Sequence, residues 1–117
     1  MRKSILVVEH EPLVRDVIAA QLRSAGYDVV TADDAGTACL LLEKTALDLV
    51  FCDLPPPNGN SGANPAGLLQ QAAKGVTVVL AGSQATLDEH TSRTVRVAKP
   101  FSVRQVLEAV KGLIPLG

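Results

Sequence analysis

The sequence predicts an α/β protein built on a mainly parallel sheet. Short continuous apolar runs such as Ile5–Val8 and Val78–Ala81 are typical of strands that are buried on both faces. These runs alternate along the chain with stretches whose apolar residues recur at helical spacing. Strands that alternate with helices are joined by right-handed crossovers, which place helices on both faces of the sheet. Aromatic residues make up only 3% of the chain, so we expect an aliphatic core.

The first elements are two strands separated by a helix. Ile5–Val8 is the first predicted strand, and Pro12 suits the first turn of the helix that follows. Gly26 is expected to end this helix, and Tyr27–Ala32 is the second strand. Asp34 is the predicted N-cap of the next helix. The apolar residues that recur at helical spacing in the first helix are Leu13, Val14, Val17, Ile18 and Leu22.

The middle of the chain contains the third strand and a long loop. The second helix is expected to run through Leu40–Lys44, and Leu47–Cys52 is a strand that is apolar except for Asp48. The prolines and glycines of the segment Pro55–Pro65 cannot sustain a helix or a central strand, so this segment is a predicted loop. A short helix is expected over Gly67–Lys74.

The last part of the chain completes five β/α units. Val76–Ala81 and Val95–Ala98 are the fourth and fifth strands, and the polar segment between them predicts a short or irregular fourth helix. Ser102 and Gln105 have the spacing of a capping box at the start of the last helix. The residues that this helix is expected to bury are Val103, Val106, Leu107, Val110 and Leu113.

Size and composition predict one domain over residues 1–117 and exclude several classes of protein. The formal net charge is −1 and there is no basic stripe, so nothing favours nucleic-acid binding. The apolar runs are too short to cross a bilayer. The basic and apolar N-terminus is interrupted too early, at Glu9–Glu11, to be a signal peptide, and we expect a cytoplasmic protein. Cys39 and Cys52 are interpreted as small buried apolar residues.

Charged and polar residues follow the predicted strands where each strand ends. In a parallel sheet the carboxyl ends of the strands meet at one edge, where reactive groups gather. We therefore expect an acidic cluster with one lysine. Glu9, His10 and Glu11 follow the first strand, and Asp53 follows the third. Gly82 and Ser83 follow the fourth strand, and Lys99 and Pro100 follow the fifth.

This set resembles the receiver domain of bacterial two-component response regulators. The resemblance covers nearly the whole chain in the right order. It implies a doubly wound, flavodoxin-like sheet of five parallel strands in the order 2-1-3-4-5, with helices on both faces. The matching stretches are Ile5–Pro12, Ala25–Val29, Asp48–Asp53, Pro57 and Lys99–Phe101.

The resemblance implies a phosphoacceptor role for Asp53, which would take a phosphoryl group from a sensor histidine kinase or a phosphotransfer protein. Lys99 would contact a phosphoryl oxygen, and its bond to Pro100 would be cis. A magnesium ion would bind through Glu9 and Asp53, and Glu11 also fits as a ligand. The domain would then be a signalling module with a possible downstream protein partner, not an enzyme beyond self-catalysed phosphoryl transfer and hydrolysis.

His10 departs from the family, which has an acidic cation ligand at this position. Magnesium prefers oxygen ligands, so we expect His10 to weaken magnesium binding. The alternatives are a site for a softer metal and a solvated loop histidine.

The other departures affect the positions through which receivers respond to phosphorylation. Gly82 stands where receivers have Thr or Ser, and only Ser83, one residue on, offers a hydroxyl group. Arg96 replaces the usual aromatic residue three positions before Lys99. The interval from Gly82 to Lys99 is also shorter than usual.

Three hypotheses follow for the function. The first is a phosphorylatable receiver, and the second is a pseudo-receiver that binds partners without phosphorylation. The third is a nucleotide-binding, flavin-binding or phosphatase enzyme on a similar sheet. The third ranks last, because the first β/α turn has no glycine-rich phosphate loop and Asp53 has no second Asp two residues on.

Overall fold

The computed structural model describes residues 2–53, 75–82 and 94–116. The predicted helix over 67–74, the long loop before it and the fourth helix lie outside these residues. The described elements are β1 (Ser4–Val8), α1 (Pro12–Ser24), β2 (Asp28–Ala32), α2 (Ala35–Lys44), β3 (Leu49–Asp53), β4 (Thr77–Gly82), β5 (Thr94–Ala98) and α5 (Val103–Leu113).

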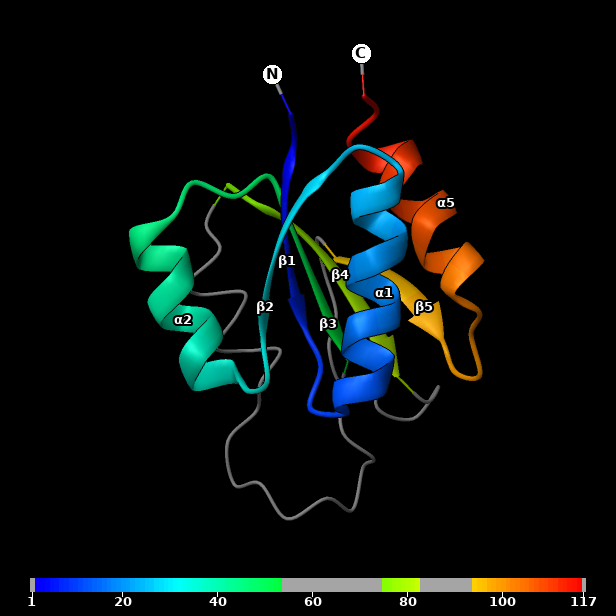
Figure 1. Ribbon diagram of the computed structural model, residues 1–117, viewed down its shortest axis with the longest axis horizontal. Helices are drawn as coiled ribbons and strands as arrows, with labels where there is room; N and C mark the ends of the chain where they lie inside the picture. Colours follow the sequence, from blue (N-terminus) through cyan, green and yellow to red (C-terminus); the bar gives the residue numbers. More distant parts are fainter. Residues whose placement is uncertain (1, 54–74, 83–93, 117) are drawn as a thin grey trace.

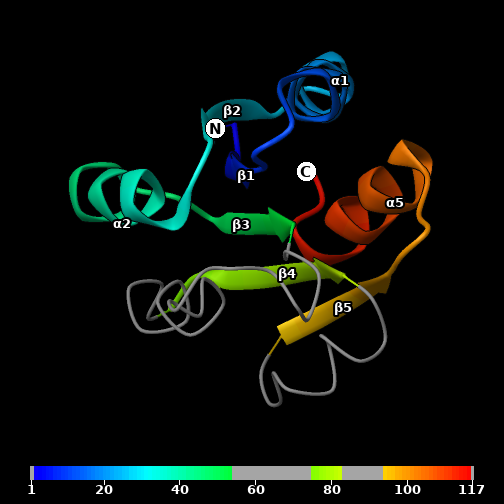
Figure 2. The same ribbon diagram turned by 90° about the horizontal axis from the view of Figure 1, so that it is seen from below.

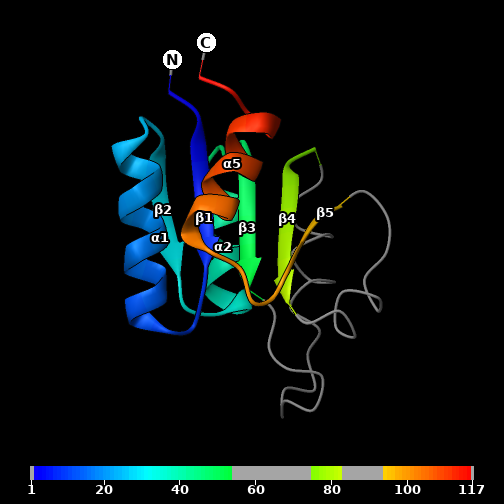
Figure 3. The ribbon, with the colours of Figure 1, turned by 90° about the vertical axis from the view of Figure 1, so that its right-hand side faces the viewer.

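The five strands form one parallel sheet in the order β2-β1-β3-β4-β5, as predicted (Figure 1). Register aligns Val8 of β1 with Cys52 of β3, and Asp53 with Ala81 of β4. The strands therefore finish at the same edge of the sheet, which is the lower edge in Figure 3. Both chain ends lie at the opposite edge.

Alternation along the strands divides the core between the two faces of the sheet. Ile5 and Val7 of β1 pack in one apolar cluster with residues of α1 and α5, whereas Leu6 and Val8 pack in a second cluster with Ala38 of α2. Figure 2 shows α1 and α5 on one side of the sheet and α2 on the other. This arrangement explains why the central strands β1, β3 and β4 are apolar at nearly every position.

The predicted helix ends are confirmed. The Asp34 carboxylate accepts the backbone N–H of Thr37 at 2.7 Å, and Gly26 after α1 has a φ of 108°. Ser102 and Gln105 form both halves of the capping box. These devices depend on residues close in sequence, which is why local patterns predict them.

The third strand begins later and ends later than predicted. The Asp48 carboxylate accepts the backbone N–H of Ser4 at 2.8 Å, which places Asp48 just before the start of β3. The strand then extends through Asp53, whose backbone pairs with β4. Asp53 therefore sits on a rigid element and not on a loop.

The prediction for the inner face of α1 was partly wrong. Ile18 and Leu22 are buried as predicted, and Ala19 is buried between them. Leu13 is 78% exposed, and Val14 and Val17 are also exposed. The helix carries two apolar stripes, and at about 100° per residue the stripe with Leu13 and Val17 faces away from the one that packs on the sheet.

Two further burial predictions needed correction. Leu113 of α5 is exposed, and Ile114 is buried in its place. The reason is a contact distant in sequence: the buried Tyr27 hydroxyl donates a hydrogen bond to the Ile114 carbonyl at 2.9 Å. Cys52 is buried as predicted, whereas Cys39 is only half-buried. Among the described residues, no helix is long and apolar enough to span a membrane.

The two stripes of α1 should differ in their effect on stability. We expect Leu22→Ala to lower the free energy of unfolding by about 2–5 kcal/mol, because it leaves a cavity in the core. Leu13→Ala should change it by less than about 0.5 kcal/mol. Urea denaturation of both variants measures this, and equal losses would show that α1 packs through the Leu13 stripe.

Candidate functional site

The parallel register brings the predicted acidic residues and the lysine to one edge of the sheet. Glu9 follows β1 directly, so the Val8–Cys52 pairing places it beside Asp53 at the end of β3. Lys99 follows β5, and its backbone N–H donates to the Gly82 carbonyl at 2.8 Å. The peptide bond between Lys99 and Pro100 is cis.

Asp53 and Lys99 form an ion pair at the centre of this edge. The Lys99 Nζ lies 2.5 Å from Asp53 Oδ1, and the Asp53 side chain is only 6% exposed. Phe101 contacts Phe51 edge to face, with ring centroids 6.0 Å apart. Because Phe51 precedes Asp53 by two residues in β3, this contact anchors the Lys99 turn to the strand that carries Asp53.

Glu9 is the one buried charged residue among those that the structure describes, with 2% exposure. Its Oε1 accepts the backbone N–H of Glu11 at 3.0 Å, while no donor from the described residues reaches Oε2. Burial raises the pKa of the Glu9 carboxyl to about 7, and the negative charge of the neighbouring Asp53 carboxylate reinforces this. The site thus holds two carboxyl groups that compete for one proton or one cation.

His10 stands at the rim of the same cluster. Its Nδ1 lies 3.3 Å from Glu9 Oε1, and its side chain is 68% exposed. Ligand atoms of Glu9, His10 and Asp53 all lie within 4.8 Å of one another. Two carboxylates suit a divalent cation, whereas the imidazole is a poor ligand for magnesium. The donor set therefore fits a divalent ion, with a nitrogen where magnesium would favour oxygen.

Two supporting residues were not predicted in these roles. Arg15 of α1 donates from Nη1 to the Glu9 backbone carbonyl at 3.1 Å. Glu11 holds Glu9 through its backbone N–H, and its carboxylate is not among the three clustered groups. Both contacts depend on how the chain turns from β1 into α1, which residue patterns do not specify.

The structure describes two of the three residues at which the chain departs from the positions that respond to phosphorylation. Gly82 ends β4 beside Ala98 of β5 and has no side chain to offer a phosphoryl group. Arg96 is exposed on β5. Ser83 lies outside the described residues.

A pocket of about 810 Å³ opens over the site. Its floor contains Glu9, Asp53 and Lys99. Its walls are mostly apolar and come from both ends of the described chain: Leu13, Val14 and Val17 of α1, with Pro100, Phe101 and Val103. The exposed stripe of α1 is therefore one wall of this pocket.

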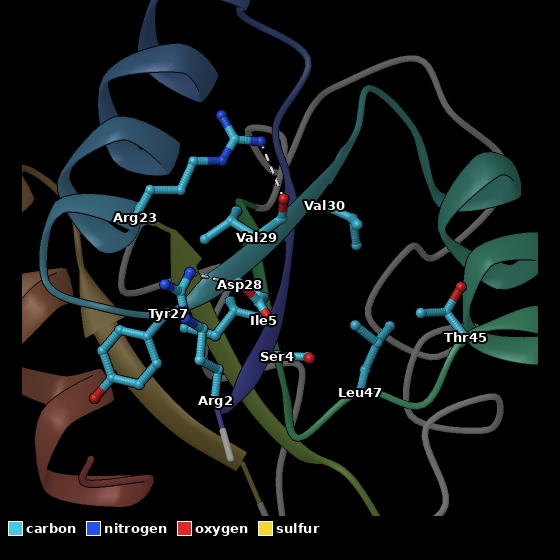
Figure 4. A pocket seen from close by; sticks show the side chains of 10 residues that line it. All are labelled: Arg2, Ser4, Ile5, Arg23, Tyr27, Asp28, Val29, Val30, Thr45 and Leu47. Atoms are coloured by element: carbon cyan, nitrogen blue, oxygen red, sulfur yellow. Dashed lines mark hydrogen bonds and ion pairs between the residues drawn. The ribbon is translucent and has the colours of Figure 1, made fainter.

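A second pocket, of about 350 Å³, lies at the amino ends of β1 and β2 (Figure 4). Its charged groups are already partnered: Arg2 contacts the Asp28 carboxylate at 3.3 Å, and Arg23 donates to the Val29 carbonyl at 3.0 Å. Among the described residues, the buried carboxyl group that lacks a hydrogen-bond donor on one oxygen is at the other edge of the sheet, beside Asp53.

The family of the chain follows from the comparison with known sequences. A family model, the response regulator receiver domain, matches residues 5–111. The chain belongs to this family. Receiver domains are modules of two-component signalling, so the sheet and its acidic edge are those of a signalling module.

Individual relatives agree with this assignment. The receiver is 25% identical over 116 residues to the probable transcriptional regulatory protein TcrX of Mycobacterium tuberculosis, with 95% of this chain and 49% of that protein covered. It is 44% identical over 54 residues to the sensor histidine kinase RcsC of Salmonella typhimurium, with 46% of this chain and 6% of that kinase covered. The chain spans about half the length of the curated regulators that it matches.

Solved structures include the response regulator TrrA of Thermotoga maritima in complex with Mg²⁺ and BeF. It superposes with a TM-score of 0.77 at 27% identity, and the match covers 96% of this receiver and 99% of that chain.

The raised pKa of Glu9 predicts an unusual pH dependence for the receiver kept free of metal with a chelator. A carboxyl whose pKa rises from 4.5 to about 7 on folding binds more protons in the folded state, so stability falls as pH increases between these values. Between pH 4.5 and about 7, we expect the wild-type protein to lose on the order of 2 kcal/mol of its free energy of unfolding, and Glu9→Gln to abolish this loss. Urea denaturation at both ends of the window tests this. The same change in the free energy of unfolding with pH in the wild-type protein and in Glu9→Gln would contradict this prediction.

Proposed function

We propose that the receiver accepts a phosphoryl group on Asp53 from a phosphohistidine of a sensor histidine kinase or phosphotransfer protein. The observation that carries this proposal is the ion pair between Asp53 and Lys99, set beside Glu9 on the floor of an open pocket. A nearly buried carboxylate at the end of a strand is held in one place and is still accessible from the pocket.

The chemistry is an in-line transfer. An oxygen of the Asp53 carboxylate attacks phosphorus, an acyl phosphate bond forms, and the bond from phosphorus to the donor imidazole breaks, with the imidazole as leaving group. The Lys99 ammonium is placed to offset the charge on the transferred oxygens. A divalent cation held by Glu9 and Asp53 would neutralise further charge; in this proposal it is magnesium, bound more weakly than in receivers with an acid in place of His10.

The apolar walls of the pocket suit a protein donor. Leu13, Val14 and Val17 form an exposed stripe directly beside the phosphoacceptor site, and Phe101 also lines the pocket. An apolar patch continuous with a reactive site is typical of a docking surface. We place the helix that carries the donor histidine on this stripe. In this account the receiver works in the cytoplasm, with signal output through a further protein partner.

The alternative is a pseudo-receiver that binds its partners without phosphorylation. His10, Gly82 and Arg96 favour it, because each replaces a residue type on which the family relies. The pairing of Asp53 with Lys99 favours the phosphoacceptor, since a binding module does not need it.

Acetyl phosphate distinguishes these two functions. With magnesium or manganese present, we expect a phosphoryl adduct on the wild-type protein by intact mass spectrometry, and none on Asp53→Asn. Asp48→Asn is the matched control, because Asp48 lies just before the other end of β3 and its substitution should leave the adduct unchanged. No adduct at any concentration of either metal, or an equal adduct on Asp53→Asn, would overturn the proposal.

A further inference from the structure

We propose that Glu9, His10 and Asp53 form a site that selects a divalent transition-metal ion of the Co²⁺, Ni²⁺ and Zn²⁺ group over Mg²⁺. The inference deepens the proposed function, in which a weakly bound magnesium ion serves, by naming the ions that the same site prefers. It rests on that function only for the role of the ion in phosphoryl transfer. Binding of the ion depends only on the positions of the three side chains.

The three ligand atoms are close enough for one ion. They lie within 4.8 Å of one another, while a metal with bonds of about 2.1 Å holds its ligand atoms about 3–4 Å apart. His10 Nδ1 is already 3.3 Å from Glu9 Oε1. Since the His10 ring is largely exposed, a rotation of this side chain closes the remaining gap without repacking the core.

Glu9 supplies the independent indication of a ligand. Its side chain is almost fully buried and its carboxyl group belongs to the cluster with His10 and Asp53, yet no donor among the described residues reaches Oε2. A buried carboxylate oxygen without a partner is costly, and metal coordination is one of the two usual ways in which proteins satisfy it.

The donor atoms select the class of ion. Magnesium takes oxygen ligands in near-ideal octahedral geometry, whereas imidazole suits zinc, nickel, iron and copper. If an acidic residue stood in place of His10, the site would have three carboxylate ligands. In this receiver it has two carboxylates and one imidazole nitrogen. Two carboxylates balance the charge of a divalent ion, and open positions remain for water or a phosphoryl oxygen.

Sulfur does not enter this set. Cys52 directly precedes Asp53, but it is buried in the cluster on the opposite face of the sheet, with Leu6 and Val8. The site therefore has nitrogen and oxygen donors and fits Ni²⁺, Co²⁺ or Zn²⁺ rather than a thiophilic ion such as Cu⁺.

The test is the ratio of the dissociation constants for Mg²⁺ and Ni²⁺, measured by calorimetry on the whole chain at neutral pH. Most protein sites prefer Ni²⁺ to some extent, so the comparison between variants is what decides. We expect His10→Asp to bind Mg²⁺ more tightly and Ni²⁺ more weakly, and so to reduce the ratio at least about tenfold. His10→Ala should lose about 10–100-fold in Ni²⁺ affinity with little change for Mg²⁺.

Two controls locate the ion. His90→Ala removes the other histidine of the sequence, and Cys39→Ser removes the half-buried thiol; neither should change Ni²⁺ affinity. The visible spectrum of bound Co²⁺ should change in His10→Ala and not in these two controls.

An unchanged ratio in His10→Asp, or loss of Ni²⁺ binding in His90→Ala, would overturn the inference. The outcome is separate from that of phosphorylation. Selective Ni²⁺ binding through His10 without an acetyl phosphate adduct would overturn the proposed function alone. An adduct on Asp53 with an unchanged ratio would overturn the metal inference alone.

Discussion

The parallel pairing of β1 with β3 places two acidic side chains next to each other at the end of a closely packed sheet, and the site depends on this constraint. Asp53 ends β3 inside the hydrogen-bonded ladder, and Glu9 follows β1 with its side chain almost entirely removed from water. Two carboxylates so close repel each other unless a cation or a proton stands between them. The pairing of Lys99 with Asp53, the raised pKa of Glu9 and the hydrogen bond from the Glu11 backbone to Glu9 Oε1 all reduce this repulsion.

The rest of the fold holds these groups at fixed positions. Residues of β1 alternate between two apolar clusters, so a shift by one position would exchange side chains between the two faces and disrupt the packing of both clusters. The contact of Phe101 with Phe51 ties the turn of Lys99 to β3. The same turn and the start of α1 form the apolar walls over the acids, so one short region serves as both the reactive site and the surface available to a donor.

Features that depend on neighbours in sequence were predicted well. The apolar runs predicted the strands, and Asp34 and Ser102 predicted helix starts, because a cap bonds within three residues. The strand-end inventory brought Glu9, Asp53 and Lys99 to one edge, because register in a parallel sheet leaves little choice. The buried face of α1 was not predicted correctly, since the helix has two apolar stripes and only the sheet decides between them. The contact of Arg15 with Glu9 and that of Tyr27 with Ile114 needed tertiary structure.

The central claim is that one cation is shared by the carboxyl groups of Glu9 and Asp53, and carboxyl ¹³C NMR during a metal titration tests it most directly. With Mg²⁺ and, separately, Zn²⁺, the account predicts that the Glu9 Cδ and Asp53 Cγ resonances shift together with the same apparent dissociation constant for each ion. The exposed Glu43 carboxyl of α2 should not respond. If Asp53 and Glu9 shifted with different constants, or if neither shifted, the two acids would not share a cation and the account would be wrong.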